Sequence, residues 1–272
     1  MTKSPIRGRP PRARKRFGQH FLEPAWVARL VDSLSPSPDD VFLEVGPGRG
    51  ALTVPLAGRV RRIVAVEIDR DLAGMLQEQR WPNVMIEQAD FLDVDVHELL
   101  RDERKPVRVV GNLPYNVSSP ILFKLLHAAA EGRAFSDATL MLQKEVADRL
   151  AAVPGTKAYG TLAIQVSLLA DVERVLTLPP GAFRPPPKVM SAVVRLRFRP
   201  AREDVGDLAT FERLVRGIFL QRRKRLLNAL KPVADSLGRS AADLITAAGV
   251  DGTKRPEELS LRDIAQLSRA ML

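Results

Sequence analysis

The chain has 272 residues, of which 45% are hydrophobic and 27% charged, a composition typical of soluble globular proteins. It contains no cysteine, which excludes disulfides, thiolate zinc sites and cysteine nucleophiles. The formal net charge is +10, which favours a polyanionic partner, with nucleic acid ahead of a membrane surface or an acidic substrate. The scattered histidines form no metal-binding pattern and no apolar run approaches the length of a membrane span, so we expect a cytoplasmic protein with no metal and no membrane partner.

Residues 1–16 are predicted to form a flexible basic arm. They carry seven lysine and arginine residues among prolines, with no acidic residue and no apolar period. Such charge suits contact with RNA phosphates, for which Arg14, Lys15 and Arg16 are candidates, and a solubilising tail is the alternative. Pro24 then precedes apolar residues at helical spacing, which predicts a first helix.

Segments typical of strands then alternate with segments typical of helices. This alternation implies an α/β fold with a mostly parallel sheet and helices on both faces. The last two strand segments lie close together in the sequence and favour an antiparallel edge. The seven predicted strands are residues 41–45, 63–67, 84–88, 107–111, 138–142, 173–178 and 191–198.

After Pro200 the apolar periodicity is helical only, which predicts a small all-α C-terminal domain. We therefore expect an arm at residues 1–16, a catalytic domain at 17–200 and a helical domain at 201–272. Ser260 and Asp263 form a capping pair for its last helix. A basic run at helical spacing predicts an RNA-contacting helix face, with a solvated face as the alternative. That run is Arg222, Arg223, Lys224 and Arg225.

Four elements predict a cofactor site at the carboxyl ends of the strands, where open α/β sheets bind ligands. They are the glycine loop at residues 46–50, Glu67, Asp90 and Asn112, each directly after or at the end of a predicted strand. Glu67 is placed to accept both hydroxyls of a ribose, a requirement that NAD and S-adenosylmethionine share. The Gly-x-Gly-x-Gly spacing and the position of Asp90 favour S-adenosylmethionine, and an NAD-dependent oxidoreductase is the disfavoured alternative.

The segment Asn112-Leu113-Pro114-Tyr115 is suited to holding an exocyclic amine. Asn112 and the Leu113 carbonyl offer hydrogen-bond acceptors, and Tyr115 offers a ring for stacking on a base. Pro114 restricts Leu113 to extended geometry, which keeps these acceptors out of a helix. A simple turn after a strand is the alternative.

Four ordered blocks together resemble the ribosomal RNA adenine dimethyltransferase family. They are Lys15-Arg16-Phe17-Gly18-Gln19-His20-Phe21-Leu22, Met141-Leu142-Gln143-Lys144-Glu145-Val146, Lys157-Ala158-Tyr159-Gly160, and the run from Phe183 to Val193 that contains Pro185-Pro186-Pro187-Lys188. The resemblance implies a class I methyltransferase fold, Rossmann-like, with S-adenosylmethionine as cofactor. It also implies dimethylation of N6 of two adjacent adenosines near the 3′ end of small-subunit ribosomal RNA. We expect the protein to be a monomer.

The resemblance also implies roles for specific residues of this chain. Asn112 to Tyr115 and Phe183 are the implied catalytic set, with the target base between the rings of Tyr115 and Phe183. Position 20 often holds asparagine in the family, and His20 departs from that pattern. The implied cofactor contacts are His20, Leu22, Gly46, Gly48, Glu67, Asp90 and Asn112. Two alternatives remain: a methylase of the large-subunit RNA that confers antibiotic resistance, and a non-catalytic ribosome assembly factor.

Overall fold

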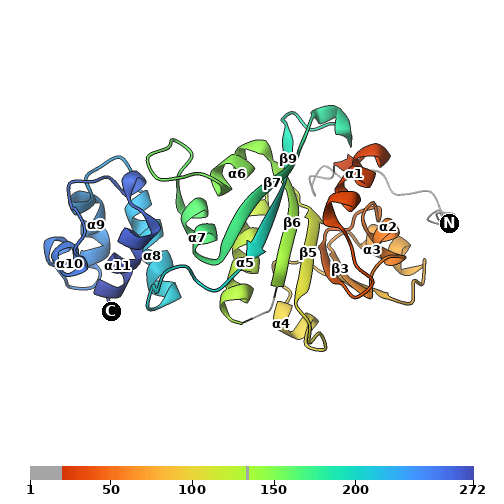
Figure 1. Cartoon of the computed structure of the whole chain (residues 1–272), viewed down its shortest axis with the longest axis horizontal. Coiled ribbons are helices and arrows are strands. Elements are labelled where there is room, and N and C mark those ends of the chain that lie inside the picture. The colour runs from red at the N-terminus through yellow and green to blue at the C-terminus, as the bar shows by residue number, and fades with distance from the viewer. Residues whose placement is uncertain (1–19, 133–134) are drawn as a thin grey trace. The chain divides into compact units, whose positions relative to one another are not determined.

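The structure is a computed structural model that describes residues 20–132 and 135–272. The predicted arm, with Arg14, Lys15 and Arg16, lies outside these residues. The chain divides into two compact units, one ending at Ala147 and completed by Glu173–Phe198, the other formed by Asp148–Val172 and Arg199–Leu272. In Figure 1 the strands of the first unit run from orange to teal and the last helices of the second are blue.

The expected domain boundary near residue 200 agrees with this division except for one segment, residues 148–172. Residues 148–172 precede the last strand of the sheet, yet they belong with the helical unit. Within that unit Tyr159 is 3% exposed and donates a hydrogen bond from its hydroxyl to the Leu259 carbonyl at 2.9 Å. Contacts of this kind join residues a hundred positions apart, so spacing along the chain does not reveal them.

Seven strands form one sheet in the order β4-β3-β2-β5-β6-β9-β7. The pairs β4–β3, β3–β2, β2–β5 and β5–β6 are parallel, whereas β9 is antiparallel to β6. The predicted mostly parallel sheet with an antiparallel edge is therefore confirmed. The strands are β2 (Val41–Val45), β3 (Arg62–Glu67), β4 (Val84–Gln88), β5 (Val107–Asn112), β6 (Phe135–Gln143), β7 (Ala170–Leu178) and β9 (Ser191–Phe198).

Apolar side chains of α1 and of the segment around α2 pack against the sheet. Leu30 and Leu34 of α1 and Leu56 of α2 share a buried cluster with Phe42 and Ile63 from two neighbouring strands. The first-unit helices are α1 (Pro24–Leu34), α2 (Thr53–Ala57), α3 (Arg70–Gln77), α4 (Val96–Leu99) and α5 (Ser118–Ala130), and α6 (Lys144–Leu150) follows β6.

Helices alone make up most of the second unit. Its helices are α7 (Thr161–Leu169), α8 (Leu208–Phe219), α9 (Leu226–Asp235), α10 (Ala241–Ala248) and α11 (Leu261–Ala270). The predicted capping pair is confirmed at α11, where Ser260 Oγ accepts from the Asp263 amide and the Asp263 carboxylate accepts from the Ser260 amide. Across the described parts of the chain, no helix combines the length and the apolar character needed to cross a membrane.

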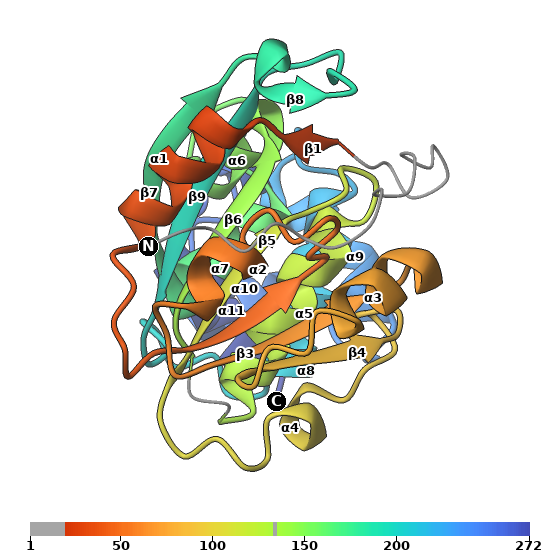
Figure 2. The ribbon, with the colours of Figure 1, turned by 90° about the vertical axis from the view of Figure 1, so that its right-hand side faces the viewer.

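A short two-stranded ribbon lies apart from the main sheet. Its strands, β1 (Phe21–Leu22) and β8 (Phe183–Arg184), are antiparallel, with Leu22 opposite Phe183 (Figure 2). The Glu23 amide extends the ribbon by donating to the Ala182 carbonyl at 2.9 Å. Strands of two residues have no period to detect, which is why the sequence did not predict this ribbon.

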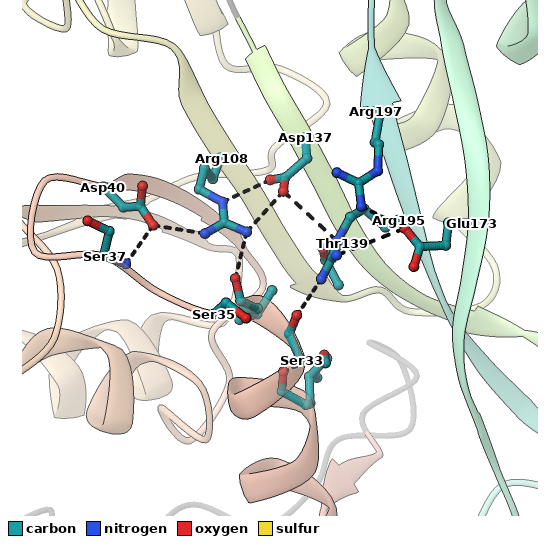
Figure 3. A network of polar contacts seen from close by, with 12 residues as sticks. Ser33, Ser35, Ser37, Asp40, Arg108, Asp137, Thr139, Glu173, Arg195 and Arg197 are labelled. Atoms are coloured by element: carbon teal, nitrogen blue, oxygen red, sulfur yellow. Dashed lines mark hydrogen bonds and ion pairs between the residues drawn. The ribbon is translucent and has the colours of Figure 1, made fainter.

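Two partly buried arginines fix the end of α1 on the sheet. Arg108 donates to the Leu34 carbonyl and to both carboxylate oxygens of Asp137, its partner on β6, while Arg195 donates to the Ser33 carbonyl (Figure 3). Cations at the end of a helix stabilise its unpaired carbonyls.

Candidate active site

A pocket in the first unit lies where β2, β3 and β5 end, the expected position for a ligand in an open α/β sheet. It brings together most of the predicted site residues from segments far apart in the sequence. Its lining comprises His20, Phe21, Leu22, Glu44, Gly46, Pro47, Gly48, Ala51, Leu52, Glu67, Ile68, Asn112, Leu113, Pro114, Tyr115 and Met141.

The glycine loop after β2 forms one wall of the pocket. Gly46, Gly48 and Gly50 have φ values of +69°, +58° and +75°, a left-handed conformation that favours glycine. A Cβ on Gly48 would also lie 3.2 Å from the ring of Phe21. The loop therefore keeps its backbone close to the pocket, and the β1 segment packs directly on it.

Glu67 holds the glycine loop from the neighbouring strand. Its two carboxylate oxygens accept hydrogen bonds from the amides of Gly48 at 2.8 Å and Asp69 at 2.9 Å. The side chain is 4% exposed, and this burial raises its pKa, against the opposing effect of the two amides. A carboxylate has about four acceptor positions, so Glu67 keeps capacity for further donors such as ribose hydroxyls.

Glu44 lines the pocket and was not predicted as a site residue. It is 1% exposed and its Oε2 accepts a hydrogen bond from the Thr53 hydroxyl at 2.7 Å. Burial, with a smaller contribution from the negative charge of Glu67, raises the pKa of Glu44 to about 7. An acidic residue inside an otherwise apolar buried strand was the available sequence signal.

Replacing Glu44 with glutamine is expected to remove a pH dependence of stability. The pKa of about 7 in the folded protein lies above the reference value of 4.5, so the carboxyl stabilises the fold fully below pH 4.5 and loses this contribution as the pH rises through 7. Glu44→Gln should therefore melt at a higher temperature than the wild type at pH 8, with a smaller difference at pH 5. Circular dichroism melts at both pH values measure this, with exposed Glu87→Gln as control. A variant with the pH profile of the wild type would contradict the shifted pKa.

Asn112 ends β5 and is held by the β1 segment. Its Nδ2 donates to the His20 carbonyl at 2.8 Å, so the side-chain oxygen is the group left to accept from a ligand. His20 is itself fixed, because its Nδ1 lies 2.8 Å from the Pro185 carbonyl, which accepts only. The orientation of the Asn112 amide thus suits an acceptor for an exocyclic amine.

Tyr115 is partly buried beside Asn112. Its hydroxyl shares a hydrogen bond of 2.6 Å with Ser191 Oγ, and its ring stacks on His20 with 5.6 Å between centroids and 24° between planes. Burial raises the pKa of the phenol, which therefore stays protonated at neutral pH.

Phe183, predicted to stack on the target base, does not line the pocket. It is 0% exposed and belongs to a buried cluster that also contains Leu22, its partner across the ribbon. Asp90 follows β4 at the expected sheet edge, but it is not among the residues that line the pocket, and its Oδ1 accepts from the Leu92 amide at 2.9 Å.

The structure places the predicted basic helix face in a turn. Residues 221–225 form the turn between α8 and α9, with Arg225 in extended geometry before the helix. Arg222 pairs with Glu257 at 3.1 Å and donates to the carbonyls of Lys157 and Tyr159, so it ties the second unit together. The next three side chains are exposed: Arg223, Lys224 and Arg225.

Comparison with known proteins agrees with this geometry. The family model described as ribosomal RNA adenine dimethylase matches residues 11–271. A ribosomal RNA small subunit methyltransferase A from Geobacter metallireducens is 46% identical over 275 residues, covering 98% of each chain. Another, from Nitrosococcus oceani, is 44% identical and covers 96% of this chain and 97% of its own.

Solved structures give the same result. A dimethyladenosine transferase from Plasmodium falciparum superposes with a TM-score of 0.74 at 25% identity, covering 91% of this chain and 96% of its own. The 23S rRNA methyltransferase ErmE gives a TM-score of 0.63 at 27% identity, covering 92% and 99%. The nearly full-length family match and the 46% identity show that this chain belongs to the ribosomal RNA adenine dimethylase family.

Proposed function

We propose that this protein transfers methyl groups from S-adenosylmethionine to N6 of two adjacent adenosines near the 3′ end of small-subunit ribosomal RNA, dimethylating each. The observation that carries the proposal is the orientation of the Asn112 amide, whose Nδ2 donates to the His20 carbonyl and whose oxygen is available to accept from the amine. The relatives at 44% to 46% identity are named for the small subunit, which supports this choice of RNA.

The pocket residues fit the proposed cofactor. S-adenosylmethionine has a sulfonium, an ammonium and two ribose hydroxyls, and the pocket offers the carboxyl groups of Glu44 and Glu67 to these cations and donors. Gly46 and Gly48 leave backbone rather than side chain facing that space. When bound, the cofactor supplies an electrophilic methyl group.

The chain's own residues would then act by positioning. The Asn112 oxygen and the Leu113 carbonyl accept hydrogen bonds from N6, and the Tyr115 ring stacks on the base. No general base is needed before the transfer, because N6 attacks the methyl carbon before its own proton becomes acidic. S-adenosylmethionine held beside Glu44 and Glu67 would supply its methyl group to N6 and leave as the thioether, and the N6 proton would pass to solvent. Catalysis therefore depends on geometry.

Other functions have weaker support. A large-subunit methylase is favoured only by the fold shared with ErmE, at 27% identity. A non-catalytic assembly factor would not need Glu67 and Asn112 to line the same pocket, as they do here. We further propose a monomeric, cytoplasmic enzyme that contacts the small subunit.

The exposed basic residues after α8 are proposed to bind RNA phosphates. Removing both Arg223 and Lys224 should reduce the slope of log affinity against log salt by about 0.7 for each lost single-strand phosphate contact. Arg222→Ala should instead lower the melting temperature, because Arg222 binds Glu257 and two carbonyls. Filter binding to small subunits at several salt concentrations measures the first effect. An unchanged slope in the double variant would exclude these side chains as phosphate contacts.

Labelled S-adenosylmethionine tests the choice of RNA. The protein is incubated separately with small and large ribosomal subunits that lack adenosine dimethylation, and incorporated label is counted in each RNA. Label in the small subunit is expected. Label only in the large subunit would overturn the assignment.

A further inference from the structure

The partner of the Tyr115 hydroxyl lies on a strand with no assigned role in the reaction. Ser191 Oγ and Tyr115 Oη are 2.6 Å apart, although the residues are 76 positions apart in the sequence. Ser191 is 0% exposed, whereas Tyr115 is only partly buried and lines the pocket. The rigid member of this hydrogen bond is therefore the serine.

Ser191 is fixed by the sheet that also carries Asn112. It is the first residue of β9 and pairs with Gln143 of β6, and Met141 on the same strand pairs with Asn112 of β5. The Lys144 amide donates to the Met190 carbonyl at 2.9 Å, which extends the contact between β6 and β9. The sheet thus sets the position of Ser191 relative to Asn112.

A second contact restricts the Tyr115 ring. The His20 imidazole stacks on one of its faces, with 5.6 Å between the centroids and 24° between the planes. A ring held at its hydroxyl and on one face has a single remaining face for a base. Pro114 restricts the backbone immediately before it.

We propose that Ser191 is a positioning residue for methyl transfer, and that its hydrogen bond fixes the tilt of the Tyr115 ring so that a base stacked there presents N6 to the Asn112 oxygen. The proposal rests on the stacking role given to Tyr115 under the proposed function. The same restraint applies to the second transfer, in which the monomethylated amine has a single N–H left to donate to these acceptors. Loss of the bond should therefore slow turnover more than it weakens binding.

Three variants and a rescue test this role. Ser191→Ala and Tyr115→Phe each remove one half of the hydrogen bond, and each should lower kcat about tenfold, since small misplacements of a reacting group cost up to about a hundredfold. KM for the small subunit and the dissociation constant for S-adenosylmethionine should change by less than about twofold, because the variants keep the contacts that bind both ligands before the reaction. The double variant should be no slower than either single variant, since both remove one interaction. Ser191→Thr keeps the hydroxyl and should restore most of the rate.

The control is a buried serine of the second unit. Ser268 is also 0% exposed, and its hydroxyl donates to the Val205 carbonyl at 2.7 Å, so Ser268→Ala measures loss of a buried serine hydroxyl without loss of the Tyr115 contact. It should leave kcat unchanged. If Ser191→Ala does not fold, Tyr115→Phe decides the question from the other side of the bond.

Two results overturn the inference. One is a kcat for a folded Ser191→Ala, or for Tyr115→Phe, within about twofold of the wild type while Tyr115→Ala is inactive. The other is a double variant whose loss is the product of the single losses. Full activity of Tyr115→Ala would overturn the proposed function instead, because it would show that the Tyr115 ring does not stack on the base. The inference about Ser191 would then fail with it.

Discussion

Asn112→Ala is expected to abolish methyl transfer while the protein remains folded and binds its RNA. The substitution removes the acceptor proposed for N6 and also the donor to the His20 carbonyl, so both the amine and the β1 segment lose a contact. A loss of at least about a hundredfold in kcat follows, because the reaction has no other source of acceleration than positioning. Steady-state transfer of labelled methyl groups to small subunits measures it.

The matched control for Asn112 lies four residues along the chain. Asn116 is exposed, and Asn116→Ala should keep the wild-type rate. Asn112→Asp keeps an acceptor but places a carboxylate against the His20 carbonyl, so its rate should fall between the other two. Equal rates for Asn112→Ala and Asn116→Ala would remove Asn112 from the mechanism.

Glu67→Gln is expected to weaken cofactor binding by about 10- to 140-fold, because hydrogen bonds to a charged group contribute about 1.5 to 3 kcal/mol and every 1.4 kcal/mol is tenfold in affinity. A glutamine side chain at this position would retain one acceptor oxygen, whereas Glu67 supplies two that already hold Gly48 and Asp69. The variant therefore loses acceptor capacity for the ribose and loosens the glycine loop.

Calorimetry with S-adenosylmethionine measures this loss, and Glu87→Gln on the neighbouring strand is its control. Glu87 is exposed and pairs in register with Val66, one residue before Glu67. Its variant should bind the cofactor as the wild type does. Binding by Glu67→Gln at wild-type affinity would place the ribose elsewhere.

The sheet could be predicted from sequence because each central strand is a mostly apolar run that ends at or just before a glycine or a polar residue. Residues 41–45, 84–88 and 191–198 were predicted with the bounds that the structure has. The joint position of Glu67 and Asn112 then follows from the rule that parallel strands end at one edge of a sheet.

Contacts that depend on side-chain direction could not be predicted in this way. The hydrogen bond between Tyr115 and Ser191 joins residues 76 positions apart, and the burial of Phe183 depends on a ribbon of two-residue strands. Arg222 belongs to a basic run typical of RNA contact, yet Glu257 and two carbonyls bind it. Charge along a sequence does not distinguish a side chain that faces solvent from one that holds a fold together.

The most direct test is to identify the nucleoside that the enzyme makes. Small-subunit RNA that lacks dimethylation is incubated with the protein and S-adenosylmethionine, digested to nucleosides and measured by mass spectrometry, with Asn112→Ala in parallel. N6,N6-dimethyladenosine is expected with the wild type at two residues per RNA, and none with Asn112→Ala. Methylation of a base other than adenine, or equal product from the two proteins, would contradict an adenosine N6 site at Asn112.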